Sequence, residues 1–338
     1  MLVVEIPFWK SHYNQLLYSA LIYTQQQQLP FRVQRNPNLP NNTAILQASG
    51  RRALLDYDDR TDLCALPQGT DLYFKRSLLP HDLVKGILPL QFQVNFAHAP
   101  WQLMYHMQRA LWWDARSRVE LVRALDVGGW LTHDAHQSKR WSAFEKAALR
   151  PPHPTGRVLY LTRLWDPDRH SGPAEKERRD ALNRFRLNTC RLLRLHVPQA
   201  TVGLYPDPLA LRMAPELVVD RRVTHKAQYL RLLHAADIGI ADDGLGDTPG
   251  WKIGEYVMAG KAIISTPIRT VVDHFEAGIH YARLQHRNDS DGVVEAVVQL
   301  QHEQQYCTMQ AHNRNWYTQH LHPVAYMQRI LTYMSADI

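Results

Sequence analysis

Short apolar runs alternate with longer amphipathic stretches throughout the second half of the chain. The short runs are rich in β-branched and aromatic residues, whereas in the longer stretches apolar residues recur every three or four positions. The predicted strands cover residues 157–162, 200–205, 217–219, 237–240 and 261–265, and the predicted helices cover residues 174–195, 226–236 and 251–259. This alternation indicates βαβ units, and therefore a parallel sheet covered by helices on both faces.

The first half is less regular but mixes the same two patterns. The predicted strands cover residues 2–6, 43–47, 54–55, 72–74 and 88–96, and the predicted helices cover residues 12–28, 101–113 and 119–125. Residues 150–156 are rich in proline, which is typical of an extended linker. Since 338 residues exceed the usual size of a single core, we expect one domain at residues 1–150, a second at residues 151–315, and a C-terminal helix at residues 316–338.

One segment, residues 247–266, has the order of a ligand-binding site: a loop, a short helix, a glycine stop and a buried strand. Pro249 and Gly250 open the helix, so its free backbone N–H groups and the positive end of its dipole face the loop. A phosphate is well accommodated at such a helix start. Glu255 lies one turn further in and can accept two hydrogen bonds from a vicinal diol such as a ribose. We expect Gly260 to end the helix in the left-handed conformation.

This segment resembles the donor-nucleotide segment of GT-B glycosyltransferases, in which an acidic residue and a glutamate are separated by seven residues. Here Asp247 and Glu255 have that spacing, followed by a glycine, a lysine and an apolar strand. The resemblance implies two Rossmann-like domains facing a cleft, with a C-terminal helix crossing back to the first domain. It also implies that Glu255 binds the nucleotide ribose and that Asp247 lies near the donor sugar. The chain departs from the pattern in having Asp247 instead of glutamate and Ala262 where proline is usual.

Arg163 directly follows a predicted strand, in a string that resembles the strand-Gly-Arg-Leu opening of GT-B nucleotide domains. The resemblance places this arginine against the donor diphosphate, where a fixed guanidinium stabilises the charge of the leaving group. The remaining candidates for the donor site are cations and helix-start residues of the second half. The expected donor-binding set is Arg163, Lys226, Asp247, Thr248, Gly250, Lys252, Ile253 and Glu255.

Candidate acceptor-side carboxylates follow an apolar pair in the first half, where a strand is expected to end. Asp58, and after it Asp59, can act as the general base on an acceptor hydroxyl if burial or a neighbouring charge tunes its pKa. Asp247 completes the candidate catalytic set. Lys75 and Arg76 follow another strand and either face the interdomain cleft or lie in solvent. Retention and inversion of the sugar configuration both stay open.

Three other classes of protein compete with this interpretation. The Asp56-Tyr57-Asp58 string also fits a metal-dependent GT-A glycosyltransferase, in which paired aspartates hold Mn²⁺ or Mg²⁺. A non-catalytic scaffold that keeps the nucleotide pocket is a further alternative. A Rossmann oxidoreductase is disfavoured because no G-x-G-x-x-G string opens a helix. His133 and His136 lack a third ligand at helical spacing, so we expect no zinc site, no other metal, and no cofactor besides the nucleotide-sugar substrate.

The net charge of +7 and the isoelectric point near 9.3 suit an anionic ligand or an anionic membrane surface. Arginines concentrate between Arg169 and Arg194, without the motifs of nucleic-acid binding. Neither a signal peptide nor a long apolar span is evident, so a cytoplasmic location, peripheral at the inner membrane face, is expected. By analogy with the family, the acceptor is a glycan or a lipid-linked sugar of bacterial surface polysaccharide or lipopolysaccharide synthesis.

Overall fold

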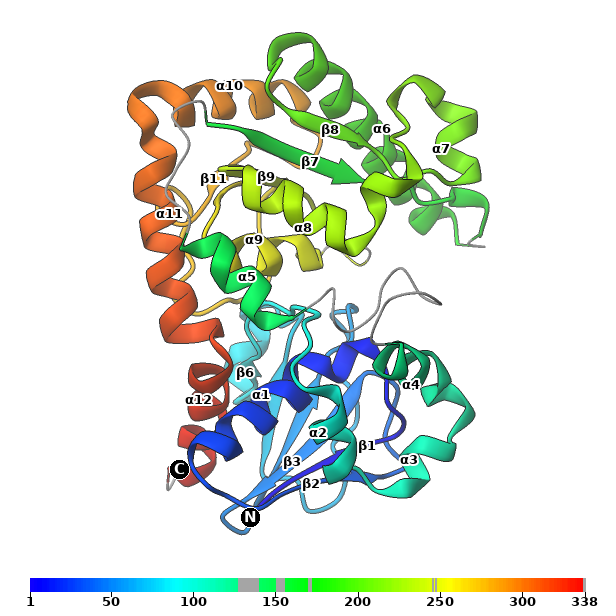
Figure 1. The fold of residues 1–338 in the computed structure, drawn as a ribbon, viewed down its shortest axis with the longest axis vertical. Coiled ribbons are helices and arrows are strands. Elements are labelled where there is room, and N and C mark those ends of the chain that lie inside the picture. The colour runs from blue at the N-terminus through cyan, green and yellow to red at the C-terminus, as the bar shows by residue number, and fades with distance from the viewer. Residues whose placement is uncertain (127–139, 150–155, 170–171, 245, 247, 337–338) are drawn as a thin grey trace.

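The protein folds into two α/β lobes, each built around its own sheet (Figure 1). A computed structural model describes residues 1–126, 140–149, 156–169, 172–244, 246 and 248–336. The sheet of the first lobe has the strand order β2-β1-β3-β4-β5-β6, and that of the second lobe has the order β11-β10-β9-β7-β8. The predicted two-lobed α/β architecture, with a C-terminal helix that packs back on the first lobe, is confirmed. The domain boundaries stay a prediction, since residues 150–155 of the expected linker lie outside the described residues.

The first sheet mixes parallel and antiparallel pairs because a tight hairpin interrupts it. Its strands are β1 (Leu2–Ile6), β2 (Phe31–Arg35), β3 (Thr43–Ala48), β4 (Arg51–Asp56), β5 (Leu72–Lys75) and β6 (Leu88–Pro89). Strand β3 pairs antiparallel with both β1 and β4, and the remaining pairs are parallel. Ser49 and Gly50 connect β3 to β4 with φ values of 51° and 79°. Positive φ at both positions is what a two-residue hairpin turn requires.

Helix α1 is buried over almost its entire surface, because elements lie on both sides of it. It spans Asn14–Gln26, and all residues from Asn14 to Thr24 are buried. The sheet lies on one side, and the last helix, α12 (Pro323–Ser335), packs on it from the far end of the chain. A helix that is buried all round needs such neighbours. The other helices of this half are α2 (Pro100–His106), α3 (Arg109–Trp113), α4 (Arg118–Leu125) and α5 (Trp141–Ala148).

The second sheet is entirely parallel, as predicted. Its strands are β7 (Val158–Thr162), β8 (Thr201–Leu204), β9 (Ile238–Ala241), β10 (Ala262–Ser265) and β11 (Ala282–Arg283). Its helices are α6 (Pro173–His196), α7 (Pro208–Met213), α8 (Lys226–Ala235), α9 (Trp251–Met258), α10 (Ser290–Gln301) and α11 (Gln305–Trp316). Strand β7 pairs with β8 on one side and β9 on the other, so the order reverses beside β7. Ligands of open α/β sheets bind at such a switch point.

Two predicted strands are wrong or much shorter than expected. Residues 217–219 form no strand, because Pro215 opens a 3₁₀ turn over Pro215–Leu217 and leaves a single bridge between Leu204 and Val218. Of the β-rich stretch at residues 88–96, only Leu88–Pro89 pair as a strand. The rest runs across the top of α1, where Gln15 bonds the backbone of Phe92 and Val94. Side-chain partners therefore replace the sheet ladder there.

The C-terminal helices α11 and α12 run along one side of the molecule and connect the two lobes (Figure 1). Helix α11 belongs to the second lobe, and α12 lies on the first, after a break at His322 and Pro323 (Figure 1). The hydroxyl groups of Tyr57 and Tyr326 share a buried hydrogen bond of 2.8 Å, which ties α12 to the end of β4. In the described residues, no helix combines the length and the apolar character that crossing a bilayer would need.

Candidate functional site: a cleft between the two sheets

A cleft of about 670 Å³ lies where the carboxyl edges of the two sheets face each other. From the first lobe it is lined by His12, Asp59 and Arg76, which follow β1, β4 and β5. From the second lobe it is lined by the ends of β7, β8 and β9 and by the loop and first turn of α9. Strands β1, β4 and β5 run in the same direction, so their carboxyl ends meet at one edge. The topology thus brings together loops that are far apart in sequence.

Two cations of the second lobe line the cleft, and neither forms an ion pair with a described residue. Arg163 is exposed and lies over the rings of Trp165 and Tyr205, 5.6 Å and 4.9 Å from their centres. The side chain of Lys252, in the first turn of α9, makes no hydrogen bond or ion pair with any described residue. Burial lowers the pKa of Lys252 to about 8. Both cations were predicted as donor-phosphate ligands, and the structure brings them to one cavity.

A third cation in the cleft wall, Arg186, is already neutralised. Its guanidinium donates two hydrogen bonds to the carboxylate of Asp242, of 2.6 Å and 2.9 Å, and the Tyr160 hydroxyl donates a third of 2.9 Å. Arg186 and Asp242 are both buried. Such a bidentate pair is rigid and offers no net charge to a ligand. It fixes the ends of β7 and β9 on the two sides of the switch point.

The start of α9 has the geometry that the sequence predicts. Gly250 is the residue before the first turn, and Gly260, with φ of 62°, ends the segment in the left-handed conformation. Gly250 and Thr248 line the cleft; Thr248 is buried, and its carbonyl accepts a hydrogen bond of 2.7 Å from the N–H of Gly244. Ile253 is buried beneath the first turn. Asp247, expected near the donor sugar, lies outside the described residues.

Lys226 and Glu255 are brought to each other rather than each to the cleft wall. The Lys226 ammonium forms an ion pair with the Glu255 carboxylate, and both side chains are largely buried. Lys226 also lies 4.8 Å from the ring centre of Tyr229, which does line the cleft. Neither Lys226 nor Glu255 itself lines the cleft. The predicted ribose contact of Glu255 and the predicted phosphate contact of Lys226 stay predictions, and a ligand that bound either would meet an existing ion pair.

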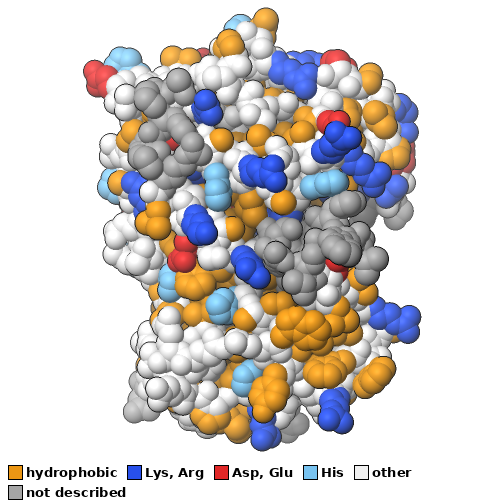
Figure 2. All heavy atoms as spheres, in the orientation of Figure 1, with side chains coloured by type: hydrophobic (Ala, Val, Ile, Leu, Met, Phe, Trp, Pro, Cys, Tyr) orange, Lys and Arg blue, Asp and Glu red, His pale blue; other side chains and the backbone are white. Residues whose placement is uncertain are grey.

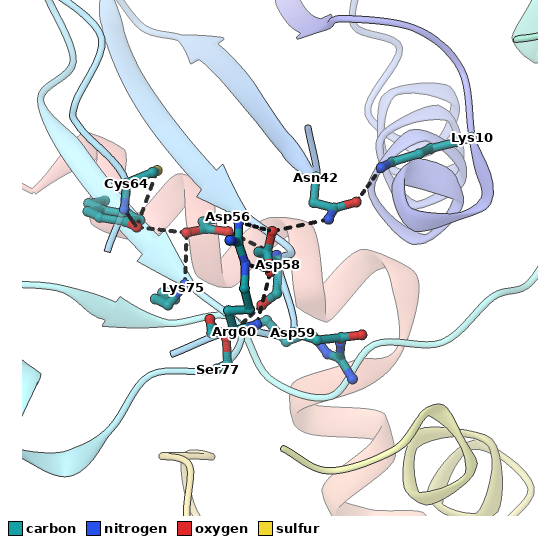
Figure 3. Close-up of polar contacts among 11 residues, drawn as sticks. Lys10, Asn42, Asp56, Asp58, Asp59, Arg60, Cys64, Lys75 and Ser77 are labelled. Atoms are coloured by element: carbon teal, nitrogen blue, oxygen red, sulfur yellow. Dashed lines mark hydrogen bonds and ion pairs between the residues drawn. The ribbon is translucent and has the colours of Figure 1, made fainter. Parts of the chain in front are cut away.

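Asp59 reaches the cleft from the first lobe, whereas Asp58 is held beside it. The Asp58 carboxylate accepts hydrogen bonds from Arg60 and Asn42 (Figure 3). Burial alone raises its pKa, but these hydrogen bonds outweigh burial and lower the pKa of Asp58 to about 2. Asp59 pairs with Arg76, whose guanidinium also donates to the Pro249 carbonyl across the cleft at 2.7 Å. Burial lowers the pKa of Arg76 to about 10, which leaves it charged at neutral pH.

Beneath this loop lies a buried ion pair of Asp56 and Lys75 (Figure 3). The Asp56 carboxylate accepts hydrogen bonds from the Lys75 ammonium at 2.9 Å, the Tyr73 hydroxyl at 2.7 Å and the Asp58 backbone N–H at 2.9 Å. Both of its oxygens are thus engaged by protein donors. Metal ligands of the GT-A type need carboxylate oxygens that are open to the ion, so the Asp56 and Asp58 pair does not fit that alternative. The Lys75 side chain neither faces the cleft nor lies in solvent.

His12 is one of the cleft residues that sequence analysis missed. It lies in a short turn after β1, and its ring packs edge-on against Trp251 at a centroid distance of 5.1 Å. Burial, together with the charges of Lys10 and Arg76, lowers the pKa of His12 to about 4, so the imidazole is neutral at pH 7. The aromatic walls Trp165, Tyr205 and Tyr229 were missed as well. Trp165 and Tyr205 follow the ends of β7 and β8, which was the available signal for these two, whereas Tyr229 lies on α8 and had no such signal.

The other candidate clusters lie outside the cleft. Asp166 and Asp168 form a solvent-facing turn in which Asp166 accepts from the Asp168 N–H at 3.1 Å. His133 and His136 lie outside the described residues. Among the residues that the structure does describe, no group of three or more histidine, cysteine or acidic side chains is arranged to hold a metal ion.

Comparisons with known proteins find similar solved structures and nothing else. No protein-family model matches the chain, and no curated protein matches it. The chain is similar to HepE from Anabaena in complex with UDP and glucose (13% identity, 99% of this chain and 98% of that one, TM-score 0.37). It is also similar to sucrose-phosphate synthase from Thermosynechococcus elongatus (11% identity, 95% of this chain and 92% of that one, TM-score 0.38). A third similar structure is WaaG, a glycosyltransferase involved in lipopolysaccharide biosynthesis (11% identity, 98% of this chain and 98% of that one, TM-score 0.36). At these TM-scores the likeness carries no argument about chemistry.

Proposed function

We propose that the chain is a glycosyltransferase that moves a sugar from a nucleotide-sugar donor to a hydroxyl of a glycan or lipid-linked acceptor. The observation that carries this proposal is a pair of cations, Arg163 and Lys252, whose side chains form no ion pair with any described residue and which line a cleft at the switch point of a parallel sheet. The start of α9 adds backbone N–H groups to the same wall. Two cations and a helix start are the groups that a diphosphate requires.

The aromatic side chains beside Arg163 suit the nucleoside. Trp165 and Tyr205 lie next to the guanidinium and line the same cleft, so an aromatic base can pack against them. A nucleotide bound in this way places its diphosphate towards α9 and its sugar towards the first lobe. The 670 Å³ cleft is in the range of pockets that hold ligands of this size.

In the reaction, the bond between the anomeric carbon and the terminal phosphate oxygen breaks, and the acceptor oxygen bonds to that carbon. The nucleoside diphosphate leaves with the electron pair, and Arg163 and Lys252 stabilise its charge. The acceptor proton passes to a group on the first lobe. Asp59 is the carboxylate that lines the cleft there, and the neutral imidazole of His12 is the second candidate base. We therefore place Asp59 ahead of Asp58 in this role.

The test is calorimetric titration with UDP, GDP, CMP, dTDP and ADP, with and without Mg²⁺. One nucleotide should bind selectively without metal, and Arg163→Gln and Lys252→Gln should each weaken it by about 2 kcal/mol, roughly thirtyfold. Arg212→Gln, an exposed arginine of α7 outside the cleft, is the matched control. No binding by any nucleotide, or binding that neither cleft variant alters, refutes the proposal.

A second assay separates an enzyme from a non-catalytic scaffold. Release of the nucleoside diphosphate from the matching nucleotide sugar is followed with and without added acceptor. We expect slow release to water, and Asp59→Asn should reduce it more than Asp58→Asn does, because only Asp59 lines the cleft. Tight binding of the nucleotide sugar without release in any condition indicates the scaffold.

A further inference from the structure

Helices α2, α3 and α4 present an unusual number of apolar side chains to solvent. Trp101 and Tyr105 lie one turn apart on α2 and are 55% and 85% exposed. Trp113, at the end of α3, is 84% exposed. On α4, Val119, Val122 and Leu125 recur at three-residue spacing and are also exposed. Figure 2 shows hydrophobic side chains gathered over these helices on the first lobe.

The charged side chains that face outward on the same three helices are arginines. Arg109 and Arg118 are exposed, and so is Arg116, in the turn between α3 and α4. Arg109 and Arg118 make no ion pair with a described residue, and neither has a hydrogen bond beyond the helix ladder there. Figure 2 shows Lys or Arg side chains at the margin of the hydrophobic area.

The acidic residues of this segment, in contrast, face inward. Asp114 has only 5% of its side chain exposed and is bound by Arg35 and Arg116. Glu120 and Asp126 are buried, and Glu120 is bound by Arg123. Among the described residues, the outward surface of α2 to α4, which we name the aromatic-arginine face, therefore combines indole and phenol rings with arginines. Its members are Trp101, Tyr105, Arg109, Trp113, Arg116, Arg118, Val119, Val122 and Leu125.

Helix α6, where the sequence concentrates arginine, does not form a comparable surface. Arg178 and Arg179 are bound to Glu175, and Arg186 is bound to Asp242. Further along, Arg191 pairs with Glu216. Most of the arginines of α6 named here are therefore neutralised by acidic residues of the second lobe. A membrane contact expected from the composition is better placed on the first lobe.

We propose that the aromatic-arginine face binds the surface of an anionic lipid bilayer. Tryptophan and tyrosine favour the headgroup region, because the ring is apolar and its N–H or O–H remains hydrogen-bonded. Arginines on the same helices contact the lipid phosphates, and each near the surface strengthens binding about fivefold. The helices are short and lie flat in such a contact, as interfacial helices do.

A second copy of the chain fits this face less well. A symmetric dimer places the same surface on both subunits. Arg109 and Arg118, which form no ion pair with a described residue, would then face their own copies, and the acidic residues of α4 and the preceding turn are already bound by Arg35, Arg116 and Arg123. Like charges opposed in an interface are unfavourable. An anionic bilayer satisfies both the rings and the arginines.

The face is joined directly to the wall of the cleft. Ser117, between α3 and α4, accepts a hydrogen bond of 2.9 Å from the N–H of Trp9, and Arg116 lies 4.3 Å from the ring centre of Phe8. Phe8 and Trp9 belong to the segment that leads to His12 in the cleft. If the proposed glycosyl transfer holds, this connection suits an acceptor that remains in the lipid layer. The bilayer contact itself does not depend on that function.

The test is co-sedimentation of the full chain with vesicles of phosphatidylcholine alone and of phosphatidylcholine with an equal amount of phosphatidylglycerol. We expect binding to the anionic vesicles only, weakened by salt. Replacing Trp101, Tyr105 and Trp113 together by serine should weaken it at least about tenfold. Arg109→Gln with Arg118→Gln should weaken it roughly 25-fold, at about fivefold for each arginine.

Matched controls come from exposed side chains of the second lobe. Leu195→Ser with Leu211→Ser tests apolar loss, and Arg212→Gln with Arg231→Gln tests charge loss. Neither should change vesicle binding, and all variants should keep the wild-type melting temperature and nucleotide affinity. Absence of binding to anionic vesicles, equal binding to neutral ones, or equal losses in the controls overturns the proposal. A concentration-dependent dimer that the face variants disrupt, without vesicle binding, assigns the face to a second copy instead.

Discussion

The charge of Lys252 can be removed by pH alone, which makes it a direct test of the proposed diphosphate site. Burial lowers its pKa to about 8, more than two units below an ordinary lysine, and it has no acidic partner among the described residues. An anion bound beside it favours the protonated form and raises this pKa. Binding therefore takes up a proton above pH 8 and none well below it.

The size of the effect follows from the fraction of Lys252 that is protonated in the free protein. With a pKa of about 8, this fraction is about 0.9 at pH 7 and about 0.1 at pH 9. If only the protonated form binds well, the affinity for a nucleoside diphosphate falls about tenfold between these pH values. The ligand's own terminal phosphate titrates near pH 6 and contributes little above pH 7.

The assay is calorimetry at half-unit steps from pH 6.5 to 9.5, with the preferred nucleotide and two buffers of different ionisation enthalpy to count protons. We expect a flat affinity up to about pH 7.5 and a decline above it, with proton uptake that rises in the same range. Lys252→Gln should bind weakly and lose the decline, whereas Arg163→Gln should bind weakly and keep it. A decline of equal size in Lys252→Gln would refute the assignment of this lysine to the phosphate.

Two further predictions concern stability and are read from the midpoint of urea unfolding. Lys75→Met leaves the Asp56 carboxylate buried without its cation and should lower the free energy of unfolding by about 3 kcal/mol or more. Arg60→Gln removes a solvent-exposed ion pair and should lower it by less than about 1 kcal/mol. Similar losses in both variants would contradict the buried pair. Gly254→Ala places a Cβ 2.8 Å from a backbone carbonyl of the first lobe and should lower the free energy of unfolding by about 1–3 kcal/mol. The Cβ of Gly250→Ala meets nothing closer than 3.6 Å, so this variant should be nearly neutral. An unchanged midpoint for Gly254→Ala would show that the lobes are not in close contact there.

The second lobe could be predicted well from sequence because its elements are local and strongly patterned. Helix α9 begins at Trp251 and ends before Gly260 as expected, since Pro249, Gly250 and Gly260 each act on the backbone next to them. The strand expected at residues 217–219 failed for the same kind of reason. Apolar composition indicated a strand, but Pro215 opened a turn instead. Local backbone chemistry outweighed hydrophobicity there.

The candidate site was predicted in part. Arg163 and Lys252 were found because residues after parallel strands and at helix starts meet at the carboxyl edge of the sheet. The pairing of Lys226 with Glu255 was not foreseen, since the two lie on different helices. Asp58 and Asp59 are neighbours in sequence, yet Asp59 lines the cleft and Asp58 does not. Which of two adjacent carboxylates faces a cavity depends on the turn that Arg60 and Asn42 fix.

By itself, the sequence determined where most helices and strands of the second lobe form. It also determined that Arg163 follows a strand and that Lys252 lies at a helix start. These properties depend on hydrophobic period, glycine, proline and short spacing, which act within a few residues. Only the tertiary structure decided that His12 and Arg76 meet Lys252 across a cleft, and that Asp56 and Lys75 are buried under it. It also decided that the acidic residues of α2 to α4 turn inward while their arginines face out. Burial and charge pairing arise between segments that are distant along the chain, and no local pattern records them.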